Sequence, residues 1–147
     1  MATISSFSDY STTYLTDSMQ CLLTTNADIV GKRAHYMYLE DKELLLLRYK
    51  SMENKPVSLV QGATLLVKSH VFRHISFPDQ NRGEYVKFCS DCLAHGFRIH
   101  SGNQYNFAAI RRKNSKDHTW IVSDKKLLTK NVSVLKVKNF KKYVSRR

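Results

Sequence analysis

The sequence is poor in the residues that define several classes of protein. Its 147 residues include only 5 Gly and 2 Pro, which excludes collagen-like and low-complexity chains. No apolar run approaches the roughly 20 residues that a membrane-spanning helix needs. The composition, with 42% hydrophobic and 24% charged residues, instead predicts a globular chain that buries a core.

Cysteines are also few and odd in number: Cys21, Cys89 and Cys92. The first 18 residues contain no basic residue and no apolar stretch, so they do not resemble a secretory signal. We therefore expect reduced thiols, synthesis in a reducing intracellular compartment and no secretion.

Acidic residues are half as frequent as basic ones, with 12 Asp/Glu against 24 Lys/Arg and a net charge of +12. Residues 1–70 carry seven of each sign, whereas residues 111–147 carry thirteen basic and two acidic residues. The positive charge thus belongs to the C-terminal part of the chain. This asymmetry predicts a nucleic acid, an acidic protein surface or a membrane surface as the partner.

The chain is organised as an arm and one domain. Residues 1–18 are rich in Ser and Thr and are predicted to form an N-terminal arm, while residues 19–147 are predicted to form a single domain. Within this domain, residues 19–80 form the N-terminal part, residues 83–140 a β-meander and residues 139–147 a basic tail. No internal repeat is evident.

Secondary structure in the N-terminal part is predicted from short apolar patterns. Residues 33–39 are rich in aromatics and predict a strand. Residues 41–52 fit either a helix, with its acids near the N-terminal end, or the second arm of a hairpin, and the helix is favoured. Residues 57–60 and 63–67 predict two short buried strands.

The C-terminal part alternates between apolar and polar residues and contains frequent turn signals. We predict a mainly β fold, with α+β as the alternative, in which the meander closes into an SH3-like or OB-like barrel. The predicted strands cover residues 85–88, 97–100, 105–112, 119–122 and 132–138.

One constellation has the residue types of a zinc site: Cys89, Cys92, His95 and His100. Only two residues separate Cys92 from His95, and no helix-forming stretch follows, so the spacing does not fit a zinc finger. No phosphate-binding loop or hydrolase motif is present, and no third group orients a Cys–His pair. We therefore expect no enzymatic activity, no metal, no cofactor and no small-molecule substrate.

The best-supported feature is a set of basic residues suited to phosphate contacts. Nearby aromatic residues could stack on bases or could fill the core: Tyr105, Phe107, Phe140 and Tyr143. The predicted polyanion-binding or partner-binding residues are Arg111, Arg112, Lys113, Lys116, Lys125, Lys126, Lys136, Lys138, Lys141, Lys142, Arg146 and Arg147.

Three short motifs follow one another between residues 84 and 138: Tyr85-Val86-Lys87-Phe88, Phe97-Arg98 with Gly102, and Thr119-Trp120-Ile121-Val122. Their order resembles a small β-domain found in proteins of large double-stranded DNA viruses. This resemblance covers little more than a third of the chain. It implies a protein of the virion, or one that acts on viral DNA, and it implies no catalytic residues.

Three hypotheses of function follow. The first is a non-enzymatic structural or assembly protein of a virion, such as a basic minor capsid or core component that contacts other virion proteins. The second is a β-barrel module that binds nucleic acid without sequence preference. The third, from another class, is a small hydrolase that uses Cys89 or Cys92.

The spacing of the zinc-type residues generates a first prediction. We expect the purified protein to carry no stoichiometric zinc, because the histidine side of the constellation is too tight for tetrahedral coordination. Elemental analysis checks this. One zinc per chain that is lost in the C92S variant would contradict it.

Overall fold

The computed structural model describes residues 6–77, 84–111 and 132–146. The chain divides into two compact units, and neither is continuous in sequence. Unit 1 contains Met1–Tyr14, Ala34–Ser51 and Gln104–Arg147, and unit 2 contains Leu15–Arg33 and Met52–Asn103. The chain therefore enters each unit more than once, and each unit is described by itself below.

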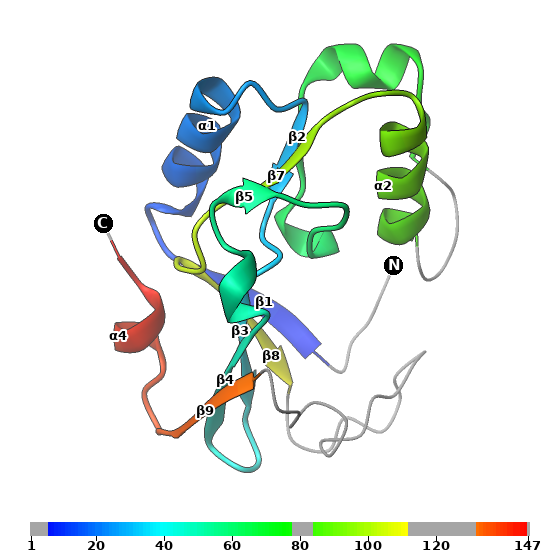
Figure 1. Ribbon diagram of the computed structural model, residues 1–147. Coiled ribbons are helices and arrows are strands. Elements are labelled where there is room, and N and C mark those ends of the chain that lie inside the picture. Colours follow the sequence, from blue (N-terminus) through cyan, green and yellow to red (C-terminus); the bar gives the residue numbers. More distant parts are fainter. Residues whose placement is uncertain (1–5, 78–83, 112–131, 147) are drawn as a thin grey trace. The chain divides into compact units, whose positions relative to one another are not determined.

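Unit 1 is built on a five-stranded sheet with the strand order β1-β8-β3-β4-β9 (Figure 1). The central pair, β8 and β3, is parallel, and the other neighbours are antiparallel. The strands are β1 (Ser6–Tyr10), β3 (His35–Leu39), β4 (Leu44–Arg48), β8 (Phe107–Arg111) and β9 (Val132–Lys136).

The sheet of unit 1 buries apolar side chains on both of its faces. On one face, Tyr38, Leu45 and Ile110 pack against Phe140 and Val144, which lie next to or within the short helix α4 (Lys141–Val144). The Tyr38 hydroxyl donates a hydrogen bond of 2.8 Å to the Val137 carbonyl. These contacts attach the segment that follows β9 to the sheet.

Two sequence predictions are corrected in unit 1. Residues 1–18 are not a loose arm, since they contain edge strand β1, which pairs over five residues with β8. The first helix also begins within them, at Tyr14. The helix favoured over residues 41–52 is wrong and the hairpin is correct. Leu45 and Leu46 are buried on opposite faces of the sheet, so consecutive leucines suit a strand that is covered on both sides.

Unit 2 contains a four-stranded sheet with the order β5-β7-β2-β6, in which β7 and β2 are parallel. Two helices of eleven residues each accompany it, and three short 3₁₀ helices lie in the connections: Lys50–Met52, Gly62–Thr64 and Ser69–Arg73. The bounds are α1 (Tyr14–Thr24), α2 (Glu84–Ala94), β2 (Ile29–Gly31), β5 (Lys55–Pro56), β6 (Leu66–Val67) and β7 (Ile99–Ser101).

The two helices of unit 2 lie on either side of β2 and β7 (Figure 1). Phe88 of α2 shares a core with Ile29 and Ile99, whereas Leu22 of α1 packs with Val30. Successive side chains of a strand point to opposite faces, which explains why Ile29 and Val30 serve different helices.

The two halves of unit 2 repeat one local design at an offset of 70 residues. Helices α1 and α2 are each followed by a residue with positive φ, Asn26 at 57° and Gly96 at 93°. Each helix then leads into a three-residue strand, and these strands pair in register, Ile29 with Ile99. Glycine and asparagine tolerate this backbone conformation best, and it ends helices frequently. The residues otherwise differ, so the sequence shows no repeat.

The predicted strand over residues 85–88 is wrong because these residues lie in α2. Phe88, Cys89 and Cys92 form one buried helical face, and the Phe97 amide donates to the Cys92 carbonyl beyond the helix end. The same helix stands where the viral resemblance implies a strand. Consequently, the described residues contain two open sheets and no closed barrel, and the fold is mixed α/β.

The remaining strand predictions have different outcomes. Residues 33–39, 105–112 and 132–138 contain β3, β8 and β9, respectively, and residues 97–100 overlap only the first two residues of β7. No strand covers residues 57–60, and residues 63–67 hold part of a 3₁₀ helix before β6. The strand expected at residues 119–122 lies outside the described residues. No helix within the part of the chain that the structure describes is long and apolar enough to cross a membrane.

Asn106 connects three segments of unit 1 and is fully buried. Its side-chain oxygen accepts hydrogen bonds from the Ser11 hydroxyl, at 2.7 Å, and from the Arg146 amide, at 2.8 Å. The backbone N–H of Asn106 donates to the Val144 carbonyl. Asn106 has a φ of 71°, a left-handed conformation that asparagine adopts more readily than most residues.

The Asn106 contacts generate a second prediction. N106A should lower the free energy of unfolding by about 2–4 kcal/mol, because it leaves two partly buried donors without their acceptor and strains the backbone. S11A removes one hydroxyl donor and leaves the Asn106 side-chain oxygen in place, so the free energy of unfolding should fall by only about 1 kcal/mol. Urea unfolding followed by circular dichroism measures both. Equal losses in the two variants would contradict the connecting role of Asn106.

Candidate functional site

Half of the predicted basic residues lie in the described part of unit 1. Arg111 is half-buried at the end of β8 and interacts with other groups there. The other described members are exposed, and we call them the C-terminal cation set: Lys136, Lys138, Lys141, Lys142 and Arg146. Arg112, Lys113, Lys116, Lys125, Lys126 and Arg147 lie outside the described residues.

The C-terminal cation set follows β9 into α4. Among the residues that the structure places, no carboxylate forms an ion pair with any of these five side chains. The Arg146 guanidinium donates to the backbone carbonyls of Lys142 and Ser145. The set is therefore a short, exposed positive segment whose side chains form no ion pair among the described residues.

Two partly exposed tyrosines lie beside these cations. The guanidinium carbon of Arg146 is 4.7 Å from the centre of the Tyr105 ring, and the Lys142 ammonium is 5.2 Å from the Tyr143 ring. Phe107 and Phe140 are buried in the core of unit 1 and cannot stack on a base. Of the four aromatics singled out in the sequence, the two tyrosines are thus suited to a ligand.

A surface pocket of about 550 Å³ adjoins the same segment. Two of the five cations, Lys141 and Arg146, line it together with hydroxyl groups from the turn after β1. The hydroxyls of that turn hold the C-terminal segment in place, since Thr13 donates to the Arg146 carbonyl at 2.8 Å. The full lining is Asp9, Tyr10, Ser11, Thr12, Thr13, Lys141, Ser145 and Arg146.

Formal charge divides unequally between the units. Unit 1 contains sixteen Lys/Arg and six Asp/Glu, a net charge of +10, whereas unit 2 contains eight and six, a net charge of +2. A charge of this size in one unit raises the local concentration of anions around it.

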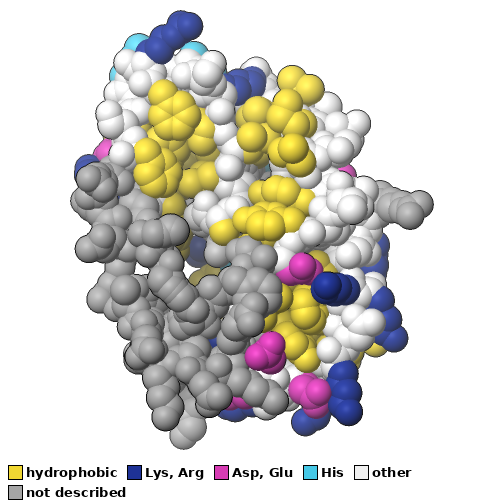
Figure 2. All heavy atoms as spheres, turned by 180° about the vertical axis from the view of Figure 1, so that it is seen from behind, with side chains coloured by type: hydrophobic (Ala, Val, Ile, Leu, Met, Phe, Trp, Pro, Cys, Tyr) yellow, Lys and Arg dark blue, Asp and Glu magenta, His cyan; other side chains and the backbone are white. Residues whose placement is uncertain are grey.

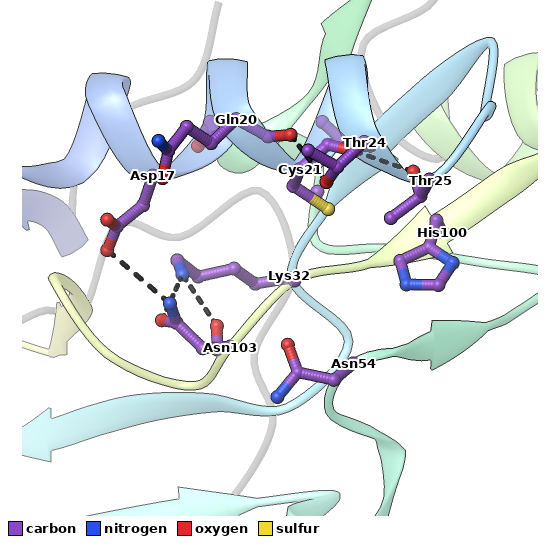
Figure 3. Close-up of a pocket in the computed structure, with 13 residues that line it drawn as sticks. Asp17, Gln20, Cys21, Thr24, Thr25, Lys32, Asn54, His100 and Asn103 are labelled. Carbon is purple, nitrogen blue, oxygen red and sulfur yellow. Dashed lines mark hydrogen bonds between the residues drawn. The ribbon is translucent and has the colours of Figure 1, made fainter.

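Unit 2 has a pocket of its own, which the sequence analysis missed. It encloses about 400 Å³ between α1, the residue that follows β2, and the loop after β7 (Figure 3). Charged and polar side chains from each of these segments point toward one another. The labelled lining residues are Asp17, Gln20, Cys21, Thr24, Thr25, Lys32, Asn54, His100 and Asn103.

Lys32 is held in this pocket at both its backbone and its side chain. Its amide donates to the Thr64 hydroxyl at 2.8 Å, and its carbonyl accepts from the Gln61 amide. The ammonium nitrogen Nζ donates to the Asn103 carbonyl at 2.6 Å and to Asn103 Oδ1 at 3.2 Å. The Asn103 amide in turn donates to Asp17 at 3.4 Å (Figure 3).

Burial changes the acidity of the groups in this pocket. Lys32 is only 4% exposed, and burial lowers its pKa from 10.5 to about 8, although the nearby Asp17 carboxylate acts in the opposite direction. Burial also raises the pKa of the Cys21 thiol and lowers that of His100. The pocket thus holds a lysine with an unusually available neutral amine.

Helix α1 buries Leu22, directs polar residues into the pocket and leaves a stripe of large apolar residues exposed. Asp17 and Cys21, four residues apart, line the pocket. Leu15, Met19 and Leu23 follow the same spacing on another face and are 60%, 41% and 71% exposed. Large apolar side chains also reach the surface at other places, and Figure 2 shows them among polar side chains on one face of the molecule.

The zinc-type residues occupy different environments within unit 2. Cys89 and Cys92 lie on the buried face of α2, in the core. His95 stacks on His74, and His100 lines the pocket. Burial raises the pKa of Cys92 to about 11 and also that of Cys89, which disfavours the thiolate that a nucleophilic cysteine needs. The described residues contain no group of three potential metal ligands.

Comparison with protein-family models, with curated proteins and with solved structures found no match.

The acidity of Lys32 generates a third prediction. Because the pKa is lowered in the folded state, the unfolded chain binds more protons between about pH 8 and pH 10.5, and stability should rise with pH there. Across this window the free energy of unfolding of the native chain should rise by on the order of 3 kcal/mol more than that of K32M. Denaturation at several pH values measures the difference. K68M retains Lys32 and serves as the control, so its stability should rise with pH as that of the native chain does. Equal pH dependence in the native chain and in K32M would contradict the lowered pKa of Lys32.

Proposed function

We propose that the protein binds nucleic acid through the C-terminal cation set of unit 1, without strong sequence preference. The observation that carries this proposal is that five exposed cations follow one another from β9 to the end of α4 and beyond, and that none of them forms an ion pair with a carboxylate of the described residues, although Asp9 lines the same pocket as Lys141 and Arg146. Exposed charges contribute little to folding. We therefore infer that the run of cations serves to bind an anionic partner.

Phosphate groups are the anions that this arrangement suits best. Lysine ammonium groups on flexible stems and an arginine fork contact phosphates without reading sequence. The two partly exposed tyrosines, Tyr105 and Tyr143, lie next to Arg146 and Lys142 and add flat rings on which unpaired bases can stack. An acidic protein surface would use the cations but would leave these rings without a role.

The local structure argues against readout of a specific sequence. Helix α4 has four residues, too few to lie along a major groove and present several base contacts. The binding energy would therefore come from released counterions and from stacking.

The virion role stays a prediction. A basic, non-enzymatic component of a large DNA virus would contact packaged DNA through this same segment. The resemblance from which that role was inferred includes Tyr85-Val86-Lys87-Phe88, which is helical here, so we base the proposal on the cation set.

Salt dependence of binding is the fourth prediction. If five phosphates are neutralised, the logarithm of the binding constant should fall against the logarithm of salt concentration with a slope of about −4.5 for duplex DNA and about −3.5 for a single strand. The variant K138A/K141A/K142A/R146A should flatten this slope by most of its value and leave the thermal midpoint nearly unchanged. Fluorescence anisotropy with labelled oligonucleotides measures both constants.

A matched variant removes the same number of charges from unit 2: K55A/K68A/R73A/R98A. It should retain the slope of the native chain. Equal losses in the two variants would mean that net charge alone attracts the polyanion and would contradict a site in unit 1. Poly-glutamate that binds as tightly as single-stranded DNA, with no effect of Y105A, would favour an acidic protein as the partner.

A further inference from the structure

The pocket of unit 2 has features that the binding of nucleic acid by unit 1 does not use. Its lining comes from four segments, and its volume of about 400 Å³ lies in the range of sites for small molecules, roughly 300–1,000 Å³. Several polar groups converge on it, and Lys32 is the single lysine among its lining residues.

The orientation of α1 indicates a function for this pocket. An ordinary surface helix buries its apolar stripe and exposes its polar one. Here Leu22 is buried against Val30, but Leu15, Met19 and Leu23 are exposed while the polar side chains of Asp17 and Cys21 line the pocket. Departures of this kind from the usual pattern occur at functional sites, where polar groups are needed inside.

Lys32 also costs more to bury than a purely structural residue would. Removing an ammonium group from water is unfavourable, and apolar residues of similar size often fill such a position as well or better. The Thr64 and Asn103 hydrogen bonds nevertheless fix both ends of Lys32 at the pocket. A buried lysine that is positioned in this way is typical of sites where its amine acts on a ligand.

We propose that the pocket of unit 2 binds a small aldehyde or ketone and that Lys32 forms an imine with it. The neutral Nζ attacks the carbonyl carbon, and the electron pair of the C=O π bond moves to the oxygen. Asp17, whose charge acts on Lys32, can accept the proton released from nitrogen and return it to oxygen. Loss of water then leaves the C=N bond, so the step needs no oxidant or reductant.

The charges of the pocket restrict the ligand. The Asp17 carboxylate, in the lining, and the Glu53 carboxylate both act on the Lys32 ammonium and offset its charge, and burial favours the neutral form of His100. The ligand is therefore a neutral or singly charged carbonyl compound, and not a polyphosphate. Once formed, a protonated imine keeps its positive charge near Asp17, which stabilises it.

Reductive trapping tests the proposal on the full chain. The protein is incubated at pH 7 with propanal or with glyoxylate, reduced with borohydride, digested and mapped by mass spectrometry. With a pKa of about 8, Lys32 has roughly 300-fold more neutral amine than an ordinary lysine with a pKa of 10.5. We expect Lys32 to be alkylated well before Lys55, which is exposed on β5 of the same unit. Peptide mapping separates Lys32 from the N-terminal amine, which also titrates near pH 8.

Variants make the test specific. K32R keeps a cation in the pocket but lacks the nucleophile, so it should lose the early adduct while K55R retains it. In the native chain the trapping rate should have its midpoint near pH 8. D17N should move this midpoint to lower pH, because the Asp17 carboxylate favours the charged lysine.

Several outcomes would overturn the proposal. Alkylation of Lys32 no faster than that of Lys55 would show that the amine is not available to a carbonyl compound. Protection of the fold by glyoxylate without any trapped adduct would indicate a non-covalent anion site instead. Because peptide mapping of the native chain needs no variant, failure of K32R to fold would leave the result interpretable.

Discussion

Parallel pairing between two distant stretches of sequence is the constraint on which both units depend. Strand β2 pairs with β7 at the centre of one sheet, and β3 pairs with β8 at the centre of the other. Parallel neighbours need a long connection between them, and here some 70 residues separate the partners. Every other strand pairs, directly or through one neighbour, with a strand of these two pairs, so neither sheet would form without them.

The polar residues of interest lie at the ends of these paired strands. Lys32 follows β2, Asn103 follows β7 and Asn106 precedes β8. At such positions the backbone leaves the sheet, so its amides and carbonyls need other partners. Asn106 supplies them through its side chain and backbone in unit 1. Lys32 and Asn103 do so in unit 2, and their side chains also create a pocket.

The two proposed activities make different demands on their units. Contacts with phosphates require exposed cations and little geometric precision, and the segment from β9 to α4 provides exposed cations. Imine formation requires one amine held in a protected site with its charge disfavoured, which burial at Lys32 provides. Opposite degrees of exposure thus suit lysine side chains of one chain to the two different functions that we propose.

By itself, the sequence determined the features that depend on composition and on short-range alternation. It located the positive charge at the C-terminal end, and it identified β3, β8 and β9, where aromatic and β-branched residues favour extended backbone. Tertiary structure decided the remainder. Residues 44–48 form the second strand of the β3–β4 hairpin and residues 84–94 form a helix, because pairing partners and buried faces override local preference. Lys32 has no motif around it, and only the meeting of α1, β2 and the loop after β7 surrounds its amine and changes its acidity.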